Sequence, residues 1–418
     1  MNHAPLRTPF VPGLLLLLLL LALFSAPVGA QGFDKFELWQ GETKLRGANI
    51  WLRVVVPELD GDEFLGNGHV GPPYTQEDFD RLATLGANWV NVSGPGLYTM
   101  TPPYRLDEKV QAEWDRLLAL IAKADLFAVI SLRTGPGRSD FTFYRDGAGN
   151  WFDRKLLIET VWTEQAAQDA WVAMWRHTAE RYRKHAVVVG YDLMTEPNAP
   201  GALLEIWEPN EFMAQHAGTL YDWNRLYPRI SRAVREVDPD TPILIGAMGW
   251  SAVAWLPSLE PTGDSRTVYV VHQYEPQDSY THQGPDGRHR YPGRFDADHD
   301  GEPEPVDRAW LNRLLNPVDQ FEKLHGVPVA VNEFGVQRWV PGGAVFLKDL
   351  MALFEQRGMN HALWMFSPSW PPARNNDEFD LLHGPDANHH AEVESNALVQ
   401  AIREGWRHNR IRPSTVGK

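Results

Sequence analysis

The sequence predicts an α/β fold, a (β/α)8 TIM barrel in a single domain with long loops on one rim. Eight short apolar segments, each typical of a buried strand, alternate with segments that carry apolar residues at helical spacing. Such alternation indicates a parallel sheet covered by helices. Eight such units in a chain of 418 residues fit a closed barrel better than an open sheet. The glycine-rich patterns of nucleotide-binding sheets do not open any of the helical segments.

The elements are expected in the following order along the chain. We expect strands at residues 45–56, 87–93, 126–133, 187–194, 242–248, 267–274, 327–332 and 359–366. We expect helices at residues 76–85, 107–124, 163–185, 223–237, 306–325 and 344–357, with a closing helix within 391–407. Thr75 suits the N-cap of the first helix, and Gly86 suits its C-terminal end. The loops after strands three, four and six are long, which is typical of functional loops.

The first 30 residues have the pattern of a secretory signal peptide. A basic residue, Arg7, precedes an apolar run at residues 14–24, and small residues at 28–30 form a cleavage site. The apolar run is too short for a comfortable membrane span. We therefore expect a signal peptide at 1–30 and a catalytic domain at 31–418 that is secreted or periplasmic. An uncleaved N-terminal anchor is the alternative.

The amino-acid composition disfavours several classes of binding partner and excludes several kinds of site. The chain has 54 acidic and 39 basic residues and a net charge of −15, which disfavours binding to nucleic acid or to anionic membranes. It has no cysteine, so disulfides, a thiol nucleophile and cysteine metal ligands are excluded. The 17 tryptophans serve core packing in the first instance, and some of them suit stacking against sugar rings. We expect a monomer without a stable membrane partner.

Two glutamates occur where buried strands end. Glu196 follows the fourth strand and Glu333 ends the seventh. A carboxylate at such a position is costly unless it has a partner or a function there, and the carboxyl ends of barrel strands meet at one mouth. Two carboxyl groups facing one bond are what glycoside hydrolysis requires, one as acid and base and the other as nucleophile. The acid, Glu196, then needs a raised pKa, whereas Glu333 must stay ionised.

Further residues near the strand ends form a set that is specific in combination. Glu196 is followed by proline, strand six ends in His272-x-Tyr274, Glu333 lies in Asn-Glu-Phe-Gly, and Trp364 lies in strand eight. Over roughly residues 36–406, this set resembles glycoside hydrolase family 5, the cellulase superfamily. The resemblance implies a retaining mechanism on a β-linked glycan, with Glu196 as acid/base and Glu333 as nucleophile. No cofactor is required for this chemistry.

The chain departs from the family pattern at three positions. The family usually has asparagine directly before the acid/base, where this chain has Thr195. The usual arginine of strand two falls near Asn91, and the usual histidine of strand three falls near Arg133. We hypothesise that Arg133 supplies the positive charge that strand two lacks. The residues expected to contact substrate are His272, Tyr274, Trp364, Thr195 and Arg133.

The sequence thus predicts a secreted retaining glycoside hydrolase that cleaves a β-glucan such as cellulose, or a mannan. Two alternatives stay open. The first is a glycan-binding barrel with impaired catalysis, because the three departures remove polar groups from the expected site. The second is a relative that acts on a glycolipid or transfers sugars to an acceptor.

A last motif lies in the long loop after strand six. Asp296, Asp298 and Asp300, with Gly301 and with Asp307 at the twelfth position, match the spacing of a calcium-binding loop, although this loop usually ends in glutamate. A solvated acidic loop explains the same residues. If the loop binds a structural Ca²⁺, the ion braces the rim and takes no part in the chemistry. No metal is expected at the catalytic residues.

Overall fold

The computed structural model describes Met1 and residues 33–370 and 377–416. Residues 34–416 form one compact unit. The predicted signal peptide, residues 1–30, lies outside the described residues except for Met1. Among the described residues, no helix has the length and apolar character needed to cross a membrane.

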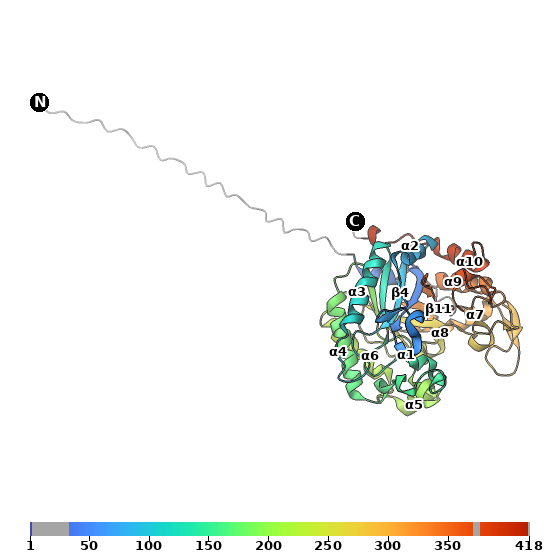
Figure 1. Cartoon of the computed structure of the whole chain (residues 1–418), viewed down its shortest axis with the longest axis horizontal. Helices are drawn as coiled ribbons and strands as arrows, with labels where there is room; N and C mark the ends of the chain where they lie inside the picture. Colours follow the sequence, from blue (N-terminus) through green and yellow to red (C-terminus); the bar gives the residue numbers. More distant parts are fainter. Residues whose placement is uncertain (2–32, 371–376, 417–418) are drawn as a thin grey trace. The chain divides into compact units, whose positions relative to one another are not determined.

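Eight parallel strands close into a barrel, which confirms the predicted fold class. In barrel order they are β1 (Arg46–Trp51), β4 (Trp89–Pro95), β5 (Phe127–Thr134), β6 (Val188–Asp192), β7 (Ile243–Gly246), β8 (Thr267–Gln273), β11 (Val329–Phe334) and β12 (His361–Leu363). Pairing of β12 with β1 closes the ring. Because the strands are parallel, their carboxyl ends all lie at one mouth. Figure 1 shows β4 and β11 inside a layer of helices.

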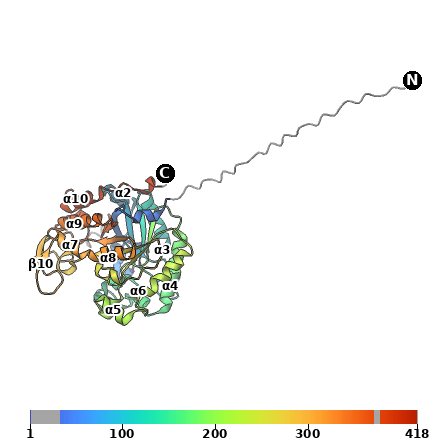
Figure 2. The same ribbon diagram turned by 180° about the vertical axis from the view of Figure 1, so that it is seen from behind.

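Helices connect most of the strands and cover the barrel. They are α2 (Gln76–Leu85), α3 (Glu108–Lys123), α4 (Gln165–Tyr182), α6 (Trp223–Arg235), α7 (Arg308–Leu314), α8 (Asn316–His325), α9 (Gly343–Gln356) and α10 (Ala397–Trp406). Shorter helices, α1 (Pro57–Phe64) and α5 (Pro209–His216), lie in loops, and the 3₁₀ helix η6 (Val253–Ser258) connects β7 to β8. Viewed from behind, α3, α4 and α6 cover one side and α7, α9 and α10 the other (Figure 2).

Helix α2 illustrates how local sequence sets the ends of an element. The Thr75 side chain accepts a hydrogen bond from the Asp78 amide, and the Asp78 side chain accepts one from the Thr75 amide, forming a capping box. Gly86 ends the helix with φ of +110°, a conformation that favours glycine. Phe79 and Leu82 are fully buried between these ends. The predicted helix at residues 76–85 is therefore confirmed at both boundaries.

Two predicted elements take a different form. Residues 306–325 contain two helices, α7 and α8, because Pro317 occupies the first turn of α8, where its missing N–H is tolerated. The first strand ends at Trp51, and the following residues form β2 (Arg53–Val54), which pairs antiparallel with β3 (Val70–Gly71). Helix α1 lies between these two short strands in the chain.

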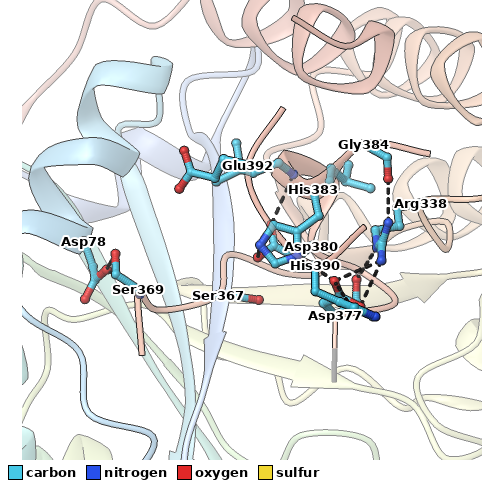
Figure 3. Close-up of polar contacts among 12 residues, drawn as sticks. Asp78, Arg338, Ser367, Ser369, Asp377, Asp380, His383, Gly384, His390 and Glu392 are labelled. Carbon is cyan, nitrogen blue, oxygen red and sulfur yellow. Dashed lines mark hydrogen bonds and ion pairs between the residues drawn. The ribbon is translucent and has the colours of Figure 1, made fainter. Parts of the chain in front are cut away.

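A buried ion pair joins the loops that follow β11 and β12. The Arg338 Nη2 donates to both carboxylate oxygens of Asp377, at 3.1 and 3.0 Å, and its Nη1 donates to the Gly384 carbonyl at 2.9 Å (Figure 3). The Nδ1 atoms of His383 and His390 lie 2.5 and 3.1 Å from the same carboxylate. Arg338 and Asp377 are 0% and 3% exposed. We call this group of five residues the rim clamp.

Candidate active site

The structure brings most of the predicted site residues into one cleft at the mouth of the barrel. The cleft has a volume of about 690 Å³. Its lining includes Glu196, Glu333, His272, Tyr274, Trp364 and Arg133. These residues lie on or directly after five strands, β5, β6, β8, β11 and β12, that are far apart in the sequence, so the closed barrel is what assembles them.

Glu196 and Glu333 meet around the ring of His272. The His272 Nδ1 lies 2.8 Å from Oε1 of Glu196 and 3.2 Å from Oε2 of Glu333. One oxygen of each carboxylate and one ring nitrogen of His272 lie within 4.8 Å of one another. Retaining glycosidases hold their two carboxyl groups about 5–5.5 Å apart, whereas inverting enzymes leave roughly 6.5–9.5 Å for a water. The observed spacing therefore fits direct attack by a carboxylate on a sugar.

The parallel strands set these positions. His272 in β8 and Glu333 in β11 are partners in the register of the two strands, beside a bulge between Val331 and Glu333. Tyr274 comes two residues after His272 and donates its hydroxyl proton to Oε1 of Glu333, at 2.9 Å. Alternate residues of an extended chain point to the same face, so both side chains reach the cleft. Each carboxylate thus has the hydrogen-bond partner that the sequence suggested.

A buried arginine holds the main chain of Glu196 in an uncommon conformation. Glu196 has φ of +52°, in the left-handed region that a non-glycine residue rarely adopts. Arg138 donates from Nη1 to the Thr195 carbonyl, at 2.6 Å, and from Nη2 to the Glu196 carbonyl, at 2.7 Å. These bonds fix the peptide groups on both sides of Glu196. The sequence analysis missed Arg138, because its partners are main-chain atoms of a segment 57 residues away.

Arg133 places a second positive charge beside the carboxylates. It is 5% exposed, and its Nε donates to Asp140 at 2.6 Å. Its guanidinium carbon lies 3.5 Å from the ring centre of Phe143 and 5.6 Å from that of Trp364. Its charge acts to lower the pKa of both catalytic-site glutamates. This position is consistent with the hypothesis that Arg133 supplies a charge that strand two lacks.

Thr195 lies behind the cleft and not in it. It is 1% exposed, and its hydroxyl oxygen lies 2.7 Å from that of Ser131. Ser131 in turn donates to Asp192, at 2.6 Å, which also accepts from Asn332 at 2.9 Å. Thr195 therefore belongs to a polar network inside the barrel. The structure corrects the expectation that it contacts substrate, because its side chain points to the barrel interior.

The charges of the cluster influence one another strongly. Burial would lower the pKa of His272, but the negative charges of Glu333 and Glu196 raise it to about 9. Burial raises the pKa of Glu333 to about 7, and the charge of Glu196 adds to this effect. Burial acts in the same direction on Glu196, but the His272 hydrogen bond and the charges of Arg133 and Arg138 bring its pKa below the ordinary value.

These directions are the reverse of the sequence-based expectation for the free site. The reason is geometric, because His272 lies closer to Glu196 than to Glu333. Arg138 also adds positive charge at the main chain of Glu196. In the free site, a proton shared by the two carboxyl groups therefore rests mainly on Glu333. His272 lies between the two carboxyl groups, hydrogen-bonded to Glu196 and within ion-pair distance of Glu333.

Aromatic residues that the sequence analysis did not single out line another part of the cleft. Trp207 and Trp250 stack with their ring centres 5.7 Å apart and their planes at 14°, and Trp255 lies with them in the cleft lining. A second cavity, of about 310 Å³, shares Trp364 with the cleft. The abundance of tryptophan suggested sugar platforms, but which indoles reach the cleft depends on the path of the loops.

The acidic loop after β8 is only partly arranged as expected. Asp296, Asp298 and Glu304 place carboxylate oxygens within 4.8 Å of one another. They lie around the hairpin of β9 (Gly293–Phe295) and β10 (Glu304–Val306), at the periphery of the barrel unit (Figure 2). Asp307, the expected twelfth-position ligand, instead caps α7 by accepting from the Trp310 amide at 2.9 Å. Glu304 replaces it in the group, and calcium binding stays a prediction.

Comparisons with known proteins agree with the fold and identify a family. The model of the cellulase family, glycosyl hydrolase family 5, matches residues 58–369. An endoglycoceramidase of Cyanea nozakii is 31% identical over 113 residues, 26% of this chain and 22% of its own length. Endoglucanase C of Acetivibrio thermocellus is 22% identical over 276 residues, 60% of this chain and 71% of its own length.

Solved structures show the same barrel. The endoglucanase Cel5A of Thermotoga maritima superposes with a TM-score of 0.61 at 19% identity, covering 88% of this chain and 99% of that one. The chain spans less than half the length of the first curated relatives it matches. The family model nevertheless matches well over half of the chain, and it includes both strand-end glutamates. The chain therefore belongs to glycosyl hydrolase family 5.

Proposed function

We propose that this chain is an active retaining glycoside hydrolase that cleaves a β-linked glycan. One observation carries the proposal, namely that oxygens of Glu196 and Glu333 and a nitrogen of His272 lie within 4.8 Å of one another in the cleft. A pair of carboxyl groups at this spacing suits double displacement through a glycosyl-enzyme ester. The substrate class is a β-glucan or mannan, the class that the resemblance implies.

In the first step, Glu333 attacks the anomeric carbon and the bond to the leaving oxygen breaks. Glu196 gives its proton to that oxygen. Tyr274 holds Oε1 of Glu333, which leaves Oε2 for attack. In the second step, Glu196 takes a proton from water, the water oxygen bonds to the anomeric carbon, and the ester to Glu333 breaks. Arg133 stabilises the carboxylate charge between these steps.

Substrate binding delivers the proton to the right carboxyl group. When the sugar reaches Glu333, its carboxylate form is favoured by the developing positive charge of the transition state. The shared proton then moves from Glu333 to Glu196, and oxygens of the two groups lie within 4.8 Å of each other. The site thus needs one proton on the pair, whichever carboxyl group holds it in the free enzyme.

We further propose that the enzyme works outside the cytoplasm as a monomer. The signal-like pattern of residues 1–30 supports export, and the acidic composition suits a soluble extracellular enzyme. Cell fractionation of the full-length chain, with the N-terminus of the exported form sequenced, tests the first point. Light scattering of the purified protein tests the second.

The experiment for the activity uses purified protein of residues 31–418 with polymeric β-glucans, mannan, xylan and aryl β-glycosides. We expect turnover of at least one substrate, and its loss in Glu333→Gln with a melting temperature that does not fall. Binding of a glycan without turnover by the wild type would contradict the proposal and favour the glycan-binding alternative. Release of an intact oligosaccharide from a glycolipid would instead replace the proposed substrate class.

A further inference from the structure

A polar network lies in the interior of the barrel, behind the cleft. Its centre is Asp192, the last residue of β6, which is 1% exposed. Oδ2 of Asp192 accepts a hydrogen bond from the Ser131 hydroxyl at 2.6 Å and one from Nδ2 of Asn332 at 2.9 Å. Asn332 lies in β11, which β7 and β8 separate from β6 in the ring, so the second bond crosses the barrel. We call Asp192, Ser131, Thr195 and Asn332 the interior network.

One arm of the interior network ends at the residue that directly precedes Glu196. This residue is Thr195, and its hydroxyl oxygen lies 2.7 Å from that of Ser131. A serine hydroxyl has a single proton, and Ser131 donates its proton to Asp192. The Thr195 hydroxyl must therefore donate to Ser131. The direction of these bonds makes Asp192 the final acceptor of the arm.

The other arm holds the peptide group that leads into Glu333. Asn332 directly precedes Glu333 and is hydrogen-bonded to Asp192 through its side chain. The carbonyl of Asn332 accepts from Nδ2 of Asn49 at 2.9 Å. Oδ1 of Asn49 in turn accepts from Nδ2 of Asn91 at 2.6 Å. The residue before Glu333 is thus fixed through both its side chain and its main chain.

Two of the three departures from the family pattern belong to this arrangement. Thr195 and Asn91 are each 1% exposed, and neither lines the cleft. Their polar groups bond inside the barrel instead. Burial raises the pKa of Asp192 above its ordinary value, and a buried carboxyl group is costly to the fold unless it has a partner or a function. The interior network therefore supports the site at positions where the family pattern is absent.

We infer that Asp192 is a positioning residue that holds Glu196 and Glu333 at the spacing that double displacement requires. This inference rests on the proposed function. Asp192 does not line the cleft, so it acts through Thr195 and Asn332. A catalytic group that moves by about 1 Å can lose on the order of 10²-fold in rate. One interior carboxyl group that fixes the residues before both glutamates therefore controls their distance from each other.

The first test compares Asp192 with another buried aspartate. Asp238 is also 1% exposed and accepts from the Tyr191 hydroxyl at 2.9 Å, but it precedes β7 and so lies at the opposite end of the strands. Asp192→Ala should lower kcat by about 100-fold and change KM by less than about threefold. The matched control, Asp238→Ala, should keep kcat within about twofold. Both variants should melt at a lower temperature than the wild type.

The conservative variant Asp192→Asn separates positioning from general damage to the fold. Its side chain keeps an oxygen that can accept from Ser131 and Asn332, so it should recover at least about tenfold of the kcat lost in Asp192→Ala. Rates are measured well below the melting temperature of each variant. Equal kcat in Asp192→Ala and Asp238→Ala would overturn the inference.

The second test removes a single hydroxyl group. Thr195→Val has the shape of threonine but no donor, whereas Thr195→Ser keeps the donor. We expect kcat about three- to tenfold lower in Thr195→Val than in Thr195→Ser, with similar KM, which corresponds to the net effect of one hydrogen bond. Equal kcat in the two variants would overturn the inference. This comparison decides the matter even if Asp192→Ala does not fold.

A third measurement does not depend on turnover. Burial lowers the pKa of His272, but the charges of Glu333 and Glu196 raise it to about 9. A displaced Glu196 should therefore lower that pKa, which NMR titration of the imidazole measures. We expect a lower pKa of His272 in Thr195→Val than in Thr195→Ser, and equal values would contradict the positioning role. If the wild type cleaves no substrate, the proposed function fails, and this titration still decides whether the interior network positions Glu196.

Discussion

Two fully buried arginines, Arg138 and Arg338, differ in whether a carboxylate is hydrogen-bonded to the guanidinium. Arg338 pairs with the Asp377 carboxylate in the rim clamp (Figure 3). In the described part of the chain, the hydrogen bonds of Arg138 go to main-chain carbonyls, those of Arg133, Thr195 and Glu196. Its Nε is buried without a hydrogen-bond partner. Burial, with the nearby charge of Arg133, lowers the pKa of Arg138 to about 9.

The difference separates a stabilising contact from a functional one. A buried guanidinium with a carboxylate partner ties two loops together, and removing either partner leaves an uncompensated charge. A buried guanidinium without such a partner is costly to the fold. The role of Arg138 lies at the site. It fixes the main chain of Glu196, and its charge lowers the pKa of the Glu196 carboxyl group. The rim clamp should therefore matter for stability, and Arg138 for catalysis.

The largest expected effects come from the two acidic residues at the centres of these regions. Glu333→Gln should reduce kcat by about 10⁴-fold or more, because the nucleophile is lost. Its melting temperature should stay the same or rise, since a buried carboxylate beside Glu196 is removed. Asp377→Asn should do the opposite, costing about 3–5 kcal/mol of unfolding free energy because Arg338 loses its counter-charge. Initial rates and thermal melts of both variants provide the check.

The arginines themselves give the sharpest contrast. Arg138→Met should lower kcat by about 10- to 100-fold, since the main chain of Glu196 is no longer held in place. It should cost less stability than Arg338→Met, because it also removes an unpaired buried charge. Arg338→Met is the matched control, and it should keep kcat within about twofold when assayed well below its melting temperature. Equal losses of kcat in Arg138→Met and Arg338→Met would contradict the distinction between a catalytic role for Arg138 and a structural role for Arg338.

The pH dependence extends the contrast to electrostatics. The pair of glutamates must hold one proton, so kcat/KM should fall as the pH rises through about 7, where that proton is lost. It should fall again at acidic pH, below the ordinary glutamate value, because the pKa of Glu196 is lowered. Arg138→Met should move the acidic limb to higher pH, since a positive charge near Glu196 is lost. A profile of Arg338→Met that shifts equally would contradict this account.

The smallest expected effect concerns the acidic loop of Asp296, Asp298 and Glu304. If it binds Ca²⁺, the ion should act as a second clamp on the rim, raising the melting temperature by about 2–4 °C without changing kcat. Glu304→Gln should abolish the calcium effect, whereas Asp307→Ala should lower stability through the loss of the α7 cap and leave the calcium effect in place. If neither calcium nor a chelator changes the melting temperature, the prediction of calcium binding is wrong.

Much of the framework could be predicted from the sequence, because it depends on local signals. The apolar periodicity indicated eight strands and their order, and Thr75 and Gly86 indicated the two ends of α2. Because Glu196 and Glu333 both lie at strand ends, the barrel fold required them to lie at the same mouth of the barrel. The structure shows them close together there. Such inferences need the fold class but no detail of side-chain packing.

The misses occur where the answer depends on contacts between distant loops. Arg138 is recognised by main-chain carbonyls, which carry no residue signature. Trp207 and Trp250 are two of 17 tryptophans, and their exposure follows from the path of the loops after β6 and β7. Thr195 was misplaced because its side chain contacts Ser131 of the neighbouring strand β5, and the sequence alone does not indicate this contact.

The most direct test of the account is the configuration of the first product. Proton NMR can follow the anomeric signals during rapid hydrolysis of the best β-linked substrate, before mutarotation mixes them. Because Glu196 and Glu333 lie too close for an intervening water, we predict that the β-anomer appears first. Initial release of the α-anomer would show single displacement by water and would contradict the roles proposed for the two glutamates.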